Sequence, residues 1–187
     1  MLEIVVPAGE TYDEARDLFI TLDKPIVLQL EHSLISISKW EEKWAIPYFL
    51  DTPKTDEQTI DYLRCMTINK NVNPDVYTYL TSDNVKQIND YISSKHTATW
   101  FTADEKKQFV KKGGRRGEII TAEIIYYWMI ALQIPFECEK WHINKLITLI
   151  RVCQEKNEPA KKMSRADVLK RNASLNAARR KAMKTRG

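Results

Sequence analysis

Short apolar runs in the first 33 residues predict a small β-sheet. Residues 2–6 and 26–30 are rich in Val, Ile and Leu, and residues 17–21 form a weaker run of the same kind. Runs of this length that are bounded by Pro and Gly are typical of strands. Because so few short strands are not stable alone, we expect an antiparallel sheet that packs on the rest of the chain.

From Leu34 onward the apolar positions recur every three or four residues, which predicts helices. Ile37, Trp40 and Trp44 suit a first helix that ends before Pro47. Residues that favour helix N-termini mark the starts of four more helices, at Thr55, Asn73, Ser82 and Thr102. Thr55 with Gln58, and Thr102 with Glu105, have the spacing of a capping box.

The strongest helical pattern covers residues 121–156. We expect Thr121 to cap a first helix and Pro135 to separate it from a second, which makes a hairpin of two helices. Six side chains on one face of the second helix should be buried, namely Trp141, Ile143, Leu146, Ile147, Ile150 and Cys153. This pair of helices should therefore be the centre of stability.

These patterns predict an α+β fold, mainly helical, with a small N-terminal antiparallel β-sheet and a basic C-terminal helical arm. The expected parts are the sheet in residues 1–33, a helical body in residues 34–157 and the arm in residues 158–187. Three of the five glycines fall in residues 111–117 among lysines and arginines, which predicts a flexible basic loop within the body.

Charge is distributed unevenly along the 187 residues. The net charge is +4, but residues 156–187 contain 11 Lys or Arg and 2 Asp or Glu, so residues 1–155 carry a net charge of −5. The charge of this arm is compatible with three roles: it can bind nucleic acid, bind an acidic protein surface, or fold back on the acidic body of its own chain. Since the last aromatic residue is Trp141, the arm has no ring on which bases could stack. We name Arg171, Arg179 and Arg180 as its candidate partner-binding residues.

The sequence contains no recognisable catalytic constellation, so an enzyme is not expected. Cys138 and His142 are four residues apart on a predicted helix, which is half of a metal site at most. No second Cys or His pair completes it, which favours a packed cysteine and histidine and no metal or other cofactor. The three cysteines lack the number and spacing of a disulfide framework, as expected for reduced thiols in a cytosolic protein.

Trp40 and Trp44 are the remaining candidates for a site. Aromatic residues at positions i and i+4 share one face of a helix. Such a pair is either part of the core or an exposed patch for a protein partner, and we name both residues as a candidate partner-binding face. There is no run of 18 apolar residues and no leading signal segment, so no membrane association is expected.

Several stretches are similar to a known family. They are residues 30–34 (LEHSL), 36–44, 119–129, 134–138, 141–144, 162–165 and 171–177. Together they resemble the tail assembly chaperones, a family of small proteins encoded in the structural-gene region of tailed bacteriophages. The resemblance extends over nearly the whole chain.

The resemblance implies a virion morphogenesis factor that acts by protein–protein binding in the host cytoplasm. A tail assembly chaperone holds the tape-measure protein soluble and recruits the tail-tube protein, and it needs no active site. Self-association is compatible with this role. Two alternatives stay open: a structural subunit retained in the virion, in the tail, connector or baseplate, and a nucleic-acid-binding protein that uses the basic arm.

Overall fold

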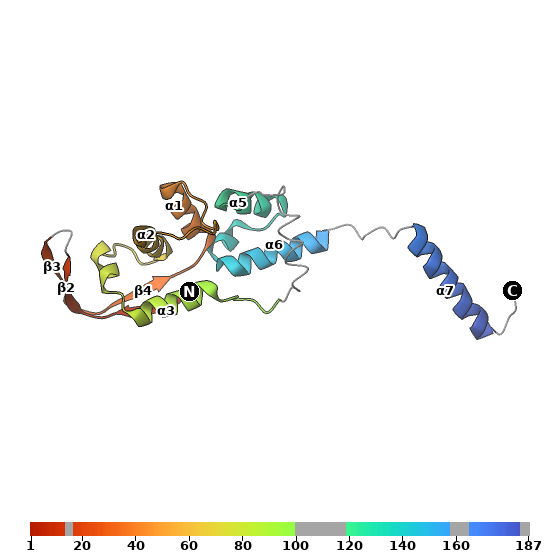
Figure 1. Cartoon of the computed structure of the whole chain (residues 1–187), viewed down its shortest axis with the longest axis horizontal. Helices are drawn as coiled ribbons and strands as arrows, with labels where there is room; N and C mark the ends of the chain where they lie inside the picture. Colours follow the sequence, from red (N-terminus) through yellow and green to blue (C-terminus); the bar gives the residue numbers. More distant parts are fainter. Residues whose placement is uncertain (14–16, 100–118, 158–164, 184–187) are drawn as a thin grey trace. The chain divides into compact units, whose positions relative to one another are not determined.

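The computed structural model describes residues 1–13, 17–99, 119–157 and 165–183 (Figure 1). These residues form a mainly helical structure with small antiparallel sheets at the N-terminus, which confirms the α+β fold. The chain divides into two compact units, residues 1–155 and 156–187. The predicted capping box at Thr102 and the basic loop at residues 111–117 lie outside the described residues.

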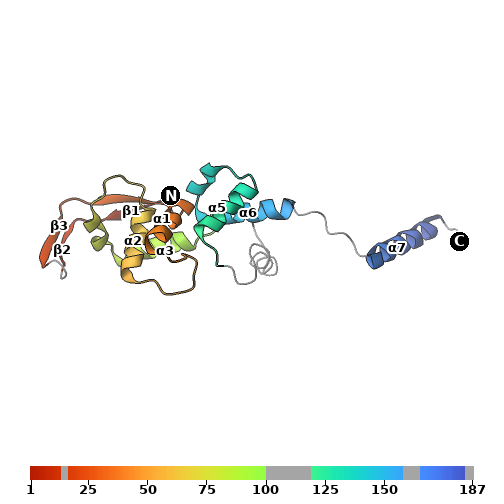
Figure 2. The ribbon, with the colours of Figure 1, turned by 90° about the horizontal axis from the view of Figure 1, so that it is seen from above.

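Four strands form two antiparallel pairs. β1 pairs with β4, with Leu2 opposite Leu30, and β2 pairs with β3, with Gly9 opposite Leu22. The views in Figures 1 and 2 both show β2 and β3 extending beyond the helices at one end of the first unit. The strands are β1 (Leu2–Val6), β2 (Gly9–Asp13), β3 (Leu18–Leu22) and β4 (Ile26–Leu30).

The pattern of the sequence predicted β1 and β4 with their observed bounds and β3 to within one residue. β2 was not expected, because its sequence GETYD contains a single large apolar residue. Its extended conformation comes from pairing with β3 instead. Tyr79 of the helical part also contacts the hairpin, since its hydroxyl donates a hydrogen bond to the carbonyl oxygen of Ile20 in β3.

Capping residues fix the first helices where the sequence placed them. Thr55 and Gln58 form the predicted capping box, and the Asn73 side chain accepts a hydrogen bond from the amide of Asp75. Ser33 and Thr81 form capping boxes at two further helices, so the helix predicted to start at Ser82 does start there but is capped by Thr81. The elements are α1 (Leu34–Trp44), α2 (Asp56–Met66), the 3-10 helix η1 (Pro74–Tyr79) and α3 (Ser82–Ser93).

The predicted continuous helix over residues 136–156 is wrong. The chain forms a short 3-10 helix η2 (Phe136–Lys140), breaks, and then forms α6 (Ile143–Asn157). The break occurs because His142 forms a β-bridge with Ser33 and the amide of Ile143 donates to the carbonyl oxygen of His32 at 2.7 Å. The expected two-helix hairpin is therefore replaced by α5 (Ala122–Ala131), η2 and α6.

One hydrophobic core joins the sheet and the helices of the first unit. Its fully buried side chains include Leu28 of β4, Trp40 of α1, Ile125 of α5 and Ile150 of α6. Trp141, which we expected in the core, is 36% exposed, and the ammonium of Lys145 lies 4.0 Å from its ring centroid.

The second unit contains α7 (Arg165–Met183). The side chains that the structure describes on this helix are exposed. They include Leu169, Leu175 and Met183, so these three large apolar side chains do not form a core.

A matched pair of isoleucines tests where stability resides. Ile150 is fully buried, whereas Ile130 is 62% exposed. Ile150→Ala should lower the free energy of unfolding by about 2–5 kcal/mol, because it removes buried apolar surface and leaves a cavity. Ile130→Ala should change it by no more than about 0.5 kcal/mol. Urea denaturation followed by circular dichroism measures both, and equal losses would contradict the assignment of the core.

Candidate functional site

Trp40, predicted as part of an exposed partner-binding face, lies in the core instead. Its side chain is fully buried, and its indole nitrogen donates to the carbonyl oxygen of Gln58 at 2.9 Å. Its ring makes edge-on contacts with Tyr48 and Tyr62. The prediction of an exposed face at Trp40 is therefore wrong, since α1 uses this residue to pack on α2.

Trp44 is partly buried against the same core. Its indole nitrogen donates to Asp61 at 3.0 Å, and Asp61 also forms an ion pair with Lys43. The side chain of Asp61 is buried, so these two partners satisfy a carboxylate that would otherwise be costly to remove from water. Trp44 thus joins α1 to α2. Of the two interpretations of this tryptophan pair, the structure favours the one in which both residues belong to the core.

Arg171, Arg179 and Arg180 lie on α7, where their side chains are exposed. This helix contains six Lys or Arg and one Asp, and its charges are distributed around the helix rather than along one face. The three arginines remain candidate partner-binding residues.

The spacing of Cys138 and His142 does not produce a shared helix face. Cys138 lies in η2, whereas His142 lies after the end of η2 and before α6. Within residues 1–13, 17–99, 119–157 and 165–183, no group of three or more His, Cys, Asp or Glu side chains is placed to hold a metal ion.

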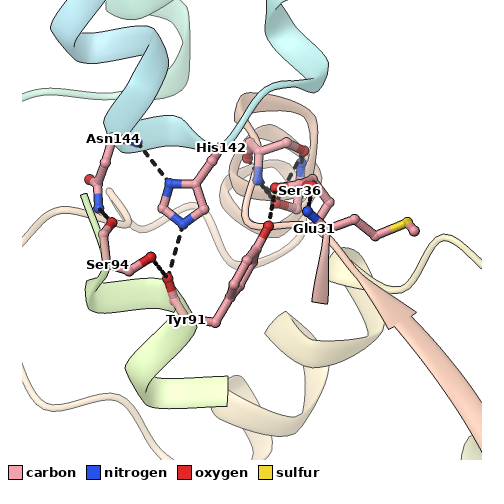
Figure 3. A network of polar contacts seen from close by, with 8 residues as sticks. Glu31, Ser36, Tyr91, Ser94, His142 and Asn144 are labelled. Carbon is pink, nitrogen blue, oxygen red and sulfur yellow. Dashed lines mark hydrogen bonds and ion pairs between the residues drawn. The ribbon is translucent and has the colours of Figure 1, made fainter. Parts of the chain in front are cut away.

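A polar network joins the end of β4, the end of α3 and the start of α6 (Figure 3). The hydroxyl of Tyr91 donates to Glu31 at 2.6 Å, and the side-chain Nδ2 of Asn144 donates to the carbonyl oxygen of Ser94 at 2.7 Å. His142 lies between these contacts. Its Nε2 donates to the carbonyl oxygen of Tyr91 at 3.1 Å, and its Nδ1 accepts from the amide nitrogen of Asn144 at 3.3 Å.

These partners determine the protonation state of His142. A carbonyl oxygen only accepts and a backbone amide only donates, so the ring is neutral with its proton on Nε2. Both nitrogens are therefore occupied, and neither is available to bind a metal or to transfer a proton to a substrate. Burial also lowers the pKa of His142, and the nearby His96 lowers it further.

The network brings together all three histidines of the sequence, which are far apart along the chain. The ring centroid of His142 lies 5.1 Å from that of His32 and 4.1 Å from that of His96. His32 is buried beside the hydroxyl of Tyr62, and burial together with the other two histidines lowers its pKa to about 3. No sequence signal indicated this cluster, because it depends on long-range packing.

A second buried acid, Glu41, connects three segments. Its Oε1 accepts from the amide of Tyr48 and its Oε2 from the amide of Ala122, both at 2.7 Å. Burial raises the pKa of Glu41, while these two hydrogen bonds oppose that shift. Thr121 makes no side-chain capping bond, so the predicted cap of α5 is supplied by Glu41 from α1 instead.

Two apolar surfaces of the first unit are exposed. On α5, Tyr127 and Ile130 are 66% and 62% exposed, and they share one face at i and i+3; we call this pair the α5 face. On the hairpin of β2 and β3, Tyr12 and Phe19 form a cross-strand aromatic pair with ring centroids 5.0 Å apart. Aromatic residues exposed in this way are enriched at protein interfaces.

The third candidate binding surface is a pocket of about 400 Å³ among α2, η1 and α3. Its lining is apolar except for the hydroxyls of tyrosine and threonine side chains, Asn89 and the single charged residue Lys54. Neither the pocket nor Lys54 was expected from the sequence, since the lining comes from four separate segments.

Comparison with protein-family models, with curated proteins and with solved structures found no match to this chain. No helix among the described residues has the length and apolar character needed to cross a membrane. The exposed faces, the pocket and the basic helix are therefore the features of this chain that bear on its function.

Protonation of the histidine cluster should destabilise the fold in acid. The unfolded chain binds a proton at His32 near pH 6.5, whereas the folded chain does so only near pH 3. As the pH falls from 7 to 5, protonation of His32 in the unfolded chain should therefore by itself lower the free energy of unfolding by roughly 2 kcal/mol. Urea denaturation at a series of pH values measures this dependence.

The matched variants are His32→Asn and His96→Asn. The first should flatten the pH dependence. The second should weaken it only in part, because it removes one of the charges that lower the pKa of His32 while burial, the largest cause, remains. Titration of the His32 Cε1 proton by NMR is a direct check that needs no variant. If that proton titrates near pH 6.5 in the folded protein, the burial argument fails.

Proposed function

We propose that this chain is a virion morphogenesis factor of a tailed bacteriophage, and that it acts as a tail assembly chaperone by binding the tape-measure protein. The stretches quoted above resemble that family. The observation that supports a protein-binding role most strongly is the exposed α5 face.

The composition of α5 is unusual for a helix at a surface. Its sequence AEIIYYWMIA contains one charged residue, Glu123, and its buried side chains occupy only part of its circumference. A helix that is apolar all round is normally buried on all sides. Tyr127 and Ile130 lie exposed on the opposite part. A protein partner that covers them would complete the burial of α5.

The partner implied by the resemblance suits this surface. A tape-measure protein is long and helical, and an amphipathic helix presents apolar side chains at a spacing that matches Tyr127 and Ile130. Recruitment of the tail-tube protein would use other surfaces, for which the aromatic pair of the β2–β3 hairpin and the arginines of α7 are candidates.

Co-expression with the tape-measure protein tests the proposal. The wild-type chain should increase the soluble fraction of the tape-measure protein and co-elute with it in size-exclusion chromatography. The double variant Tyr127→Ser/Ile130→Ser should lose co-elution without a change in melting temperature, because both side chains are exposed. Ile68→Ser is the matched control, since Ile68 is also exposed (52%) but lies outside α5.

If neither solubility nor co-elution depends on the wild-type chain, the chaperone role is excluded. Mass spectrometry of finished virions distinguishes a chaperone from the alternative, a structural subunit that is retained in the virion. A chaperone should be missing from them, whereas a structural subunit should be present at a fixed copy number.

The exposed basic helix α7 favours nucleic-acid binding as a second candidate function. Contacts with phosphates make affinity depend on salt, and each contact contributes a slope of about −0.9 in a plot of log affinity against log salt. Arg171→Gln, Arg179→Gln and Arg180→Gln should each reduce the slope for duplex DNA by about 1. Lys86→Gln on α3 is the control, and no binding at low salt would exclude this function.

A further inference from the structure

The pocket among α2, η1 and α3 has the construction of a ligand site. Its volume of about 400 Å³ lies within the range of small-molecule pockets. Its floor is formed by four buried side chains from three elements, namely Tyr62, Leu63, Tyr77 and Ile88. The hydroxyls of Tyr62 and Tyr77 already have partners in His32 and Thr67, so they leave an apolar surface toward the pocket.

Lys54 is the single charged residue of the lining. Its ammonium donates to the carbonyl oxygen of Tyr48 at 3.0 Å and lies 4.5 Å from the centroid of the Tyr48 ring. Across the described part of the chain, no carboxylate forms an ion pair with it. Partial burial lowers the pKa of Lys54, so its charge is held here without the counter-charge that would offset desolvation.

We propose that this pocket binds an apolar chain or ring that ends in a carboxylate. The apolar part lies against Leu63 and Ile88, and the carboxylate pairs with Lys54. The lining has one cation and no other charged group, which suits a monoanion. A phosphate, with up to two charges and three oxygens to satisfy, would need more donors than Lys54 supplies.

A cationic ligand fits the same pocket poorly. The aromatic rings of Tyr48 and Trp40 near the ammonium of Lys54 are surfaces on which a cation would bind. Lys54 already occupies them, however, and a second cation would be repelled at this distance. An anion, in contrast, gains both the ammonium and the apolar walls.

Titration of the methyl-labelled full chain with decanoate, below its micelle concentration, tests the proposal. Decan-1-ol has the same chain without the charge and serves as the comparison ligand. The methyl signals of Ile60, Leu63, Ile88 and Ile92 should shift, and decanoate should bind about tenfold more tightly than decan-1-ol, as expected for a hydrogen bond to a charged group.

Three variants separate the contributions. Lys54→Met should weaken decanoate binding about tenfold and leave decan-1-ol binding unchanged, whereas Lys86→Met, on the exposed side of α3, should change neither. Val85→Trp places a large ring at the rim and should block both ligands. Equal affinity for the two ligands, shifts confined to other methyl groups, or no binding would overturn the proposal. None of these results bears on tape-measure binding, so the two proposals fail separately.

Discussion

The first unit depends on the backbone of residues 31–33, where three distant parts of the chain form hydrogen bonds. The amide of Glu31 donates to the carbonyl oxygen of Met66, and the carbonyl oxygen of His32 accepts from the amide of Ile143. Ser33 then caps α1 and also forms the β-bridge with His142. Because buried backbone groups must be paired, these contacts fix where β4 ends, where α1 begins and where α6 starts.

This constraint also explains which predictions from the sequence were correct. The bounds of β1 and β4 and the capping box of Thr55 and Gln58 follow from residues that are neighbours in the chain, so local patterns suffice for them. The break at His142 and the cap on α5 from Glu41 depend on partners about 80 to 110 positions away. Periodicity alone continues a helix through such a break, because nothing local at residues 141–142 opposes it.

The same contrast between local patterns and long-range contacts applies to the candidate site at Trp40 and Trp44. The spacing of Trp40 and Trp44 indicated that they share a face of the helix, but not whether that face is covered. Both side chains pack inward because α2 lies against this face of α1. The two stretches at residues 30–34 and 141–144, which carry part of the resemblance to tail assembly chaperones, meet at this same backbone junction. That part of the resemblance therefore concerns the framework of the fold, while a protein-binding role depends on other residues.

The buried polar groups support this separation of framework and surface. Both nitrogens of His142 and both oxygens of Glu41 are engaged by the protein itself, so each stabilises a junction and has no free atom to offer a ligand. Lys54 differs from them, because it holds its charge beside an apolar pocket with a carbonyl oxygen and an aromatic ring as its partners. The α5 face also differs from these buried groups, because its apolar side chains Tyr127 and Ile130 remain exposed to water. Incomplete burial at the α5 face and incomplete charge pairing at Lys54 thus both occur away from the junction, at the two surfaces that are proposed to bind another molecule.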